Sequence, residues 1–253
     1  MSSSTRTVWG FDLSEPRWSA FKGKNMFDKR WPHLRRERLF AYQLTQNICI
    51  GATIPATISL AKYRDLRTNV QQYALTKFDM EVELHVDDII TANILTLTFC
   101  AFVSSLFALE FIILVLWPRR TSYPKWHNRT RMILPPIMTT GLLLAAIVDT
   151  IMVFKHSGFI TGASAEVQEQ LTTFFFRPPL KYMSYPANIV SVCFIWIAWV
   201  CAVITTILLI IGVRREMKGG SETREMTPAP AQVSENEKPS NEFPEDPSRL
   251  STL

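Results

Sequence analysis

Residues 89–117 read IITANILTLTFCAFVSSLFALEFIILVLW, and Glu110 is the one charged residue among them. A helix rises about 1.5 Å per residue, so roughly 20 apolar residues cross the ~30 Å hydrocarbon core of a bilayer. Three further apolar stretches of sufficient length lie at 39–61, 132–154 and 187–213. The sequence therefore predicts an all-α membrane protein built as a four-transmembrane-helix bundle.

The positive charges predict the orientation of this bundle. Most of the 27 Lys and Arg residues lie in three segments, which are 1–38, the loop 118–131 and the tail 214–253. The loops 62–88 and 155–186 hold the remainder. Because Lys and Arg beside membrane spans accumulate on the cytoplasmic side, both termini and the middle loop are expected to be cytoplasmic.

The two terminal segments differ in composition. Segment 1–38 interleaves aromatic and basic residues, which favours binding to anionic lipid of the inner leaflet; a solvated positive flank is the alternative. The tail 214–253 is rich in Glu, Pro and Ser, with Gly219-Gly220 near its start. It is predicted to be disordered, because such a composition buries too little apolar surface to order the chain.

Both outer loops carry a pattern of secondary structure. Met80–Val86 alternates apolar and polar residues, which indicates a strand that pairs with the second outer loop or with another protein; extended structure without a partner is the alternative. Ala163–Phe176 predicts a short amphipathic helix with Val167, Leu171 and Phe174-Phe175 on one side. That helix is either an anchor at the membrane interface or a buried cap on the bundle.

Glu110 and Asp149 are the ionisable residues deep in the predicted spans, where a charge is costly and needs partners. Counting along the helices places other polar residues at the same two depths. Near Glu110 these are Gln46, Thr139, Thr140, Thr205 and Thr206; near Asp149 they are Thr53, Thr57, Asn93, Thr96 and Ser191. We expect Glu110 to face the bundle and to bind Gln46, Thr205 or Thr206. The two layers are either hydrogen bonds that hold the helices in register or a path for protons or ions.

Several classes of function lack support in the sequence. The four cysteines lie inside predicted spans, so no disulfide-bonded ectodomain is expected. No hydrolase, redox or metalloprotease motif occurs, the histidines have no metal-ligand spacing, and no cofactor is expected. The net charge of +5 arises beside the spans, which does not indicate nucleic-acid binding. The layout resembles that of MARVEL-type four-span proteins in topology alone.

The leading hypothesis is a non-enzymatic multi-pass protein of the plasma membrane or an endomembrane. It would act as a membrane-organising scaffold or as an accessory subunit of a membrane complex. Its partners would be the lipid bilayer, another membrane protein or a second copy of the chain. The alternative is a small transporter or channel that uses Glu110 and Asp149 as intramembrane carboxylates; a membrane enzyme that acts on lipid is a third, weaker possibility. Pairs of small residues four apart predict close helix contacts and could also serve oligomerisation: Ala52/Ala56, Ala101/Ser105, Gly141/Ala145 and Ala198/Ala202.

Overall fold

The computed structural model describes residues 7–8, 11–12, 35–116, 125–175 and 177–225, with 7–8, 11–12, 125 and 216–225 as backbone only. The expected lipid contact of segment 1–38 lies almost wholly outside the described residues. Within that segment, β1 (Thr7–Val8) and β2 (Phe11–Asp12) form an antiparallel pair.

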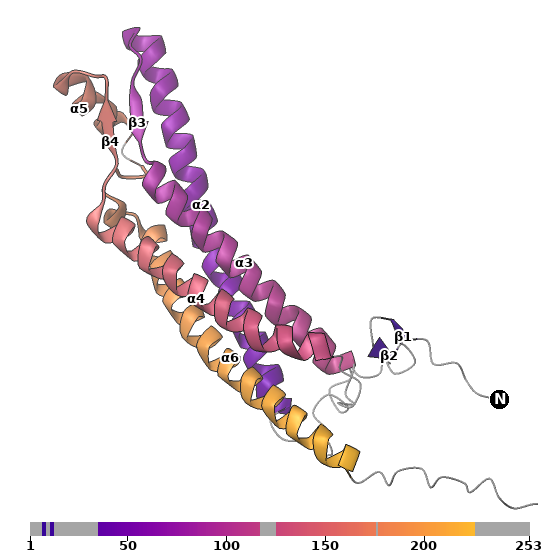
Figure 1. Ribbon diagram of the computed structural model, residues 1–253. Helices are drawn as coiled ribbons and strands as arrows, with labels where there is room; N and C mark the ends of the chain where they lie inside the picture. The colour runs from indigo at the N-terminus through magenta and orange to yellow at the C-terminus, as the bar shows by residue number, and fades with distance from the viewer. Residues whose placement is uncertain (1–6, 9–10, 13–34, 117–124, 176, 226–253) are drawn as a thin grey trace, which may run out of the picture.

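Four long helices form the body of the molecule: α2 (Arg35–Phe78), α3 (Asp87–Leu116), α4 (Lys125–Lys155) and α6 (Pro186–Glu225). Each contains a stretch that is long and apolar enough to cross a membrane. The helices run alternately up and down (Figure 1), and α2 and α4 each pack against both α3 and α6. The prediction of four long apolar helices is therefore confirmed. We call the end where α2 begins and α6 ends the termini end, and the opposite end the loop end.

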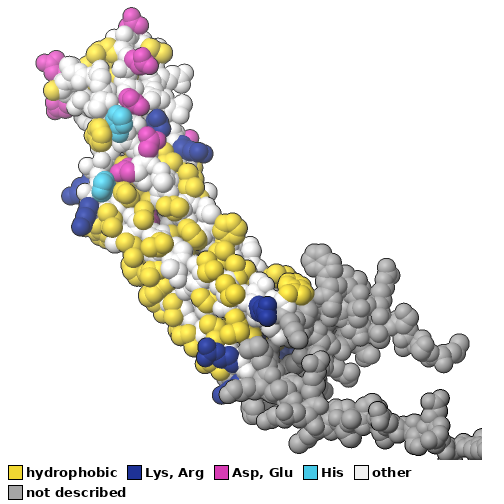
Figure 2. Space-filling view, viewed as in Figure 1, with side chains coloured by type: hydrophobic (Ala, Val, Ile, Leu, Met, Phe, Trp, Pro, Cys, Tyr) yellow, Lys and Arg dark blue, Asp and Glu magenta, His cyan; other side chains and the backbone are white. Residues whose placement is uncertain are grey.

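On the face seen in Figure 2, a band of apolar side chains covers the bundle, Lys and Arg side chains border this band, and Asp and Glu gather at the loop end. Every long helix contributes exposed apolar residues to this band. Examples are Ile50, Ile54 and Ile58 on α2, Phe102 and Leu109 on α3, Ile137 and Leu144 on α4, and Ile197, Val200 and Ile204 on α6. A surface of this kind suits hydrocarbon rather than water.

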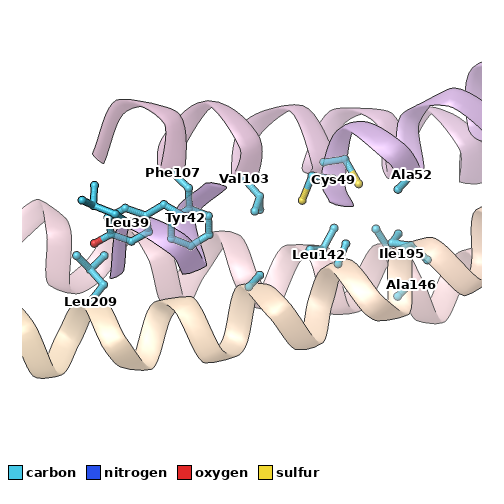
Figure 3. Packing of buried hydrophobic residues seen from close by; sticks show 14 of the residues in the cluster. Leu39, Tyr42, Cys49, Ala52, Val103, Phe107, Leu142, Ala146, Ile195 and Leu209 are labelled. Atoms are coloured by element: carbon cyan, nitrogen blue, oxygen red, sulfur yellow. The ribbon is translucent and has the colours of Figure 1, made fainter. Parts of the chain in front are cut away.

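The core of the bundle combines large side chains near the termini end with small ones further along (Figure 3). Tyr42 of α2 stacks on Phe107 of α3 with 5.7 Å between ring centroids. Ala52, Ala146 and Ala198 are fully buried, so the helix backbones approach closely there. Of the predicted small-residue pairs, Ala101/Ser105 differs from the rest, because both residues are exposed on the outside of α3.

Helix α2 extends far beyond its predicted span. The loop predicted at 62–88 is helical as far as Phe78, and this extension projects from the bundle at the loop end. Its buried stripe consists of Tyr63, Leu66, Val70 and Ala74, spaced three and four residues apart, with polar residues on the other faces. The polar faces lower the mean hydropathy of this stretch. An amphipathic helix of this kind is therefore not recognised by the high hydropathy that marks membrane spans.

Two other predicted boundaries change. Helix α4 begins at Lys125, so part of the loop predicted at 118–131 is helical. Helix α6 continues to Glu225, and the first part of the tail predicted to be disordered is therefore helical too. The rest of that prediction, residues 226–253, lies outside the described residues.

A small folded layer covers the loop end. Strand β3 (Glu83–His85) pairs in antiparallel register with β4 (Phe159–Thr161), so that Leu84 lies opposite Ile160. The strand predicted from the alternation in the first outer loop is confirmed, and its partner is the second outer loop. Helix α5 (Ala165–Phe174) confirms the predicted short helix, and the 3-10 helix η3 (Tyr182–Ser184) precedes α6.

Helix α5 packs onto the extension of α2. Leu171 is buried in a second apolar cluster, where Val167 and Phe175 also pack. Phe174 remains 62% exposed, but its ring stacks on Tyr73 of α2 at 4.9 Å. These contacts favour the buried cap over the interfacial anchor.

Candidate functional site

The termini end holds a buried ion pair. Arg131 Nε of α4 lies 2.8 Å from Glu110 Oε2 of α3, and the two side chains are 1% and 5% exposed. Glu110 therefore faces the bundle as expected, but Arg131 was assigned to the middle loop. Because α4 begins before Arg131, the guanidinium reaches into the bundle next to the carboxylate.

Two more buried arginines lie on the first turns of α2. Arg35 donates to the Leu114 carbonyl at 3.0 Å, and Arg38 Nε donates to the Tyr42 hydroxyl at 3.2 Å. The Arg38 guanidinium packs directly against Gly212 of α6, where a larger side chain would collide with it. The sequence analysis placed both arginines in the cytoplasmic segment 1–38, because no pattern shows that α2 begins before its apolar stretch.

Three of the threonines expected around Glu110 form hydrogen bonds between helices instead. Thr45 and Thr205 hydroxyls lie 2.8 Å apart, and those of Thr139 and Thr206 lie 3.0 Å apart. Gln46 is half-buried, and Thr140 is exposed and donates to the Pro136 carbonyl of its own helix. The expected bond from Glu110 to Gln46, Thr205 or Thr206 is thus replaced by the ion pair with Arg131. This layer has the character of hydrogen-bond contacts between helices.

The second layer surrounds Asp149, which is 1% exposed. Ser191 of α6 donates to Asp149 Oδ2 over 3.4 Å, while Oδ1 has no hydrogen-bond partner among the described residues. Asn93 and Thr96 of α3 are buried as predicted. Thr53 and Thr57 are not part of this layer: Thr53 is half-buried, Thr57 is exposed, and both donate to carbonyls of α2 itself.

A hydrogen-bonded chain adjoins this layer and ties α2, α3 and α6 together. Asn93 Nδ2 donates to Ser59 Oγ at 3.1 Å, and Ser59 donates to Asn188 Oδ1 at 2.5 Å. Asn188 Nδ2 in turn lies 3.3 Å from the Tyr63 hydroxyl, which donates to the Pro179 carbonyl at 3.1 Å. Burial raises the pKa of Tyr63 to about 12. The sequence analysis missed Ser59, Tyr63 and Asn188, which lie near the ends of the predicted spans.

Asp88 at the start of α3 contacts two residues of the second outer loop. The Tyr182 hydroxyl donates to Asp88 Oδ1 at 2.6 Å, and His156 Nδ1 lies 3.4 Å from Oδ2. Burial and, secondarily, the neighbouring Asp88 raise the pKa of the Tyr182 hydroxyl. A neutral phenol at Tyr182 is therefore part of the folded loop end.

A groove of about 980 Å³ lies between the α2 extension and the strand pair. Its lining residues come from α2, from β3 with the residues before it, and from the end of β4: Thr68, Gln71, Gln72, Leu75, Glu81, Val82, Glu83, Thr161 and Gly162. Val82 is buried, whereas Glu81 and Glu83 are exposed. The groove presents amides, hydroxyls and two carboxylates, and none of these lining residues is basic.

Comparison with protein-family models, with curated proteins and with solved structures finds no match for this chain. Among the described residues, no group of three or more His, Cys, Asp or Glu side chains could hold a metal ion. The structure offers a carboxylate at Glu110 that pairs with Arg131, a carboxylate at Asp149 with one oxygen that has no described hydrogen-bond partner, and a groove outside the apolar band.

Proposed function

We propose that the chain is a multi-pass membrane protein with both termini and the α3–α4 connection in the cytoplasm. The apolar band of the bundle and the distribution of Lys and Arg along the sequence support this topology. The acidic loop end then lies on the opposite side of the membrane, whether that is the plasma membrane or an endomembrane.

Its function is that of a non-enzymatic scaffold or accessory subunit that holds a partner protein at the loop end. The observation that carries this proposal is the groove of about 980 Å³, which is built from folded elements that stand clear of the apolar band. The α2 extension and β3–β4 form a platform with its own buried cluster. Short loops would be enough to connect four membrane-spanning helices. A folded layer at the loop end is therefore suited to the recognition of a partner protein.

The partner that fits the groove is an extended protein segment carrying Lys or Arg. Glu81 and Glu83 supply negative charge at the groove, and the glutamines and threonines of its walls can bond to a peptide backbone. Charge complementarity of this kind increases both specificity and the rate of association.

Crosslinking tests this role. A photoreactive amino acid at Gln72, inside the groove, should form an adduct with one partner in native membranes, and the double variant Glu81→Lys/Glu83→Lys should abolish it. The matched control is Glu166→Lys/Glu169→Lys on α5, which changes the charge equally at residues that do not line the groove. An adduct that persists in the groove variant, or that both variants abolish equally, contradicts the proposal.

Asp149 favours a second candidate, a small transporter or channel, because one of its buried oxygens has no described hydrogen-bond partner. Glu110 supports it less, because Arg131 already neutralises its charge. In proteoliposomes, a flux of protons or alkali cations that Asp149→Asn abolishes would establish transport, and absence of flux in the wild type would rule against it.

A further inference from the structure

Near the level of Asp149, all four long helices contribute buried polar side chains. Ser191 of α6 contacts Asp149 directly, and Ser59 of α2 contacts Asn93 of α3. Asn93 uses its amide nitrogen for the bonds to Ser59 and to the Ile89 carbonyl, which leaves its side-chain oxygen as an acceptor.

The register between α3 and α4 places Thr96 about five residues, or roughly 7 Å of helix rise, on the termini side of Asp149. Phe99 packs against Gly141, and Asp149 lies about two turns beyond Gly141 toward the loop end. Side chains tilt toward the N terminus of their helix. In these antiparallel helices, the Thr96 side chain therefore tilts toward the loop end. The Asp149 side chain tilts toward the termini end, so the two side chains tilt toward each other.

The Thr96 hydroxyl is unusual among the helix threonines. Thr91, Thr98, Thr140 and Thr150 each donate to the carbonyl four residues earlier in the helix. Thr96 makes no such bond, and its buried hydroxyl has no hydrogen-bond partner among the described residues. Because the Thr96 hydroxyl does not donate to the carbonyl four residues earlier, its oxygen can serve as a ligand of a cation.

A proton does not satisfy Asp149. If Oδ1 carries the proton, it is a buried donor without an acceptor; if Oδ2 carries it, Oδ1 is still an acceptor without a donor. The 3.4 Å between Ser191 Oγ and Asp149 Oδ2 is also long for a hydrogen bond to a carboxylate, which is typically about 2.5–2.7 Å. The spacing also fits a shared cation, because two oxygens at right angles and about 2.3–2.6 Å from one ion, as in calcium sites, are roughly 3.3–3.7 Å apart.

We propose that Asp149, Ser191 and Thr96 bind one monovalent metal cation, Na⁺, between α3, α4 and α6. The single carboxylate of the site balances one positive charge, whereas a divalent ion would leave a net charge in the interior of the bundle. Oxygen ligands are those that hard cations prefer. The ion joins three helices, and this role is independent of any partner in the groove.

The experiment measures the thermal unfolding of the purified full chain in lipid nanodiscs, in NaCl and in choline chloride at equal ionic strength and pH. Saturating Na⁺ should raise the melting temperature by roughly 5–10 °C, because a ligand that binds only the folded state stabilises it. Asp149→Asn should abolish this response. The control Asp88→Asn, at the loop-end boundary, should retain it.

Thr96→Val keeps the proposal testable if Asp149→Asn does not fold. Losing one neutral ligand should raise the Na⁺ concentration at half-maximal response roughly tenfold, as measured for supporting groups of metal sites. Equal melting temperatures of the wild type in NaCl and choline chloride would overturn the proposal. A Na⁺ response that is unchanged in Thr96→Val would show that the ion binds elsewhere and would overturn it too.

Discussion

At the scale of single residues, the Glu110–Arg131 pair shows how a charge is kept inside an apolar bundle. Desolvating two charges is expensive, and their attraction offsets the cost only when the geometry is close, as the 2.8 Å contact is. Removing one partner should therefore destabilise the fold more than removing both.

A double-mutant cycle checks this expectation. Glu110→Leu should lower the free energy of unfolding by roughly 3–5 kcal/mol, because it leaves a buried guanidinium without this carboxylate. Adding Arg131→Met to Glu110→Leu should restore a large part of that loss. The quantity to measure is the unfolding free energy of all four proteins in one detergent. Additive losses would contradict the structural importance of the pair.

Tyr182→Phe is a milder change at the loop end. It removes the donor to Asp88 and should cost roughly 1–3 kcal/mol. Because folding raises the pKa of Tyr182, the wild type should keep its stability up to the ordinary tyrosine pKa of about 10 and lose it as the pH rises further. The alkaline loss should be smaller in Tyr182→Phe. Unfolding curves between pH 8 and about 11 measure both effects, and an identical alkaline loss in the two proteins would contradict this role.

At the scale of elements, the local pattern of apolar and polar residues predicted secondary structure that overall composition does not reveal. The period-2 alternation before His85 predicted a strand, and the register of β3 with β4 confirms it. The α2 extension was missed because the residues between Leu66, Val70 and Ala74 of its buried stripe are mostly polar and lower the mean hydropathy. In the candidate site, the burial of Glu110 and Asp149 could be predicted, because a charged side chain that faces lipid is costly. Arg131 as the partner could not be predicted, because that pairing depends on where α4 begins.

Gly162 follows β4 and lies against the backbone just before β3, so a substitution there tests the contact between the two segments. Its φ of +85° is a conformation that side chains rarely adopt, and an added Cβ would lie 2.7 Å from the Glu81 carbonyl oxygen. Gly162→Ala should therefore loosen the layer, with faster hydrogen exchange of β3 and β4 amides and unchanged exchange in the bundle. Gly51→Ala is the control, because it meets only a flexible ring edge of Phe194 at 3.2 Å. Unchanged exchange in Gly162→Ala would contradict this contact.

At the scale of the whole molecule, the proposed topology places α5 on one side of the membrane and residue 128 on the other. The chain contains the acceptor sequence Asn128-Arg129-Thr130 at the termini end. On α5, Gln170 and Thr172 are exposed, so the single change Gln170→Asn creates a second acceptor sequence, at the loop end.

Translation into microsomes, where the glycan is transferred on the lumenal side, reads the topology directly. The wild type should carry no glycan, because Asn128 lies on the cytoplasmic side. Gln170→Asn should gain one glycan, seen as a mass shift that a glycosidase reverses. The variant Gln170→Asn/Thr172→Ala lacks the acceptor sequence again and should lose the shift. A glycan on Asn128 of the wild type would invert the topology, and the groove would then face the cytoplasm, where its partner would have to be sought.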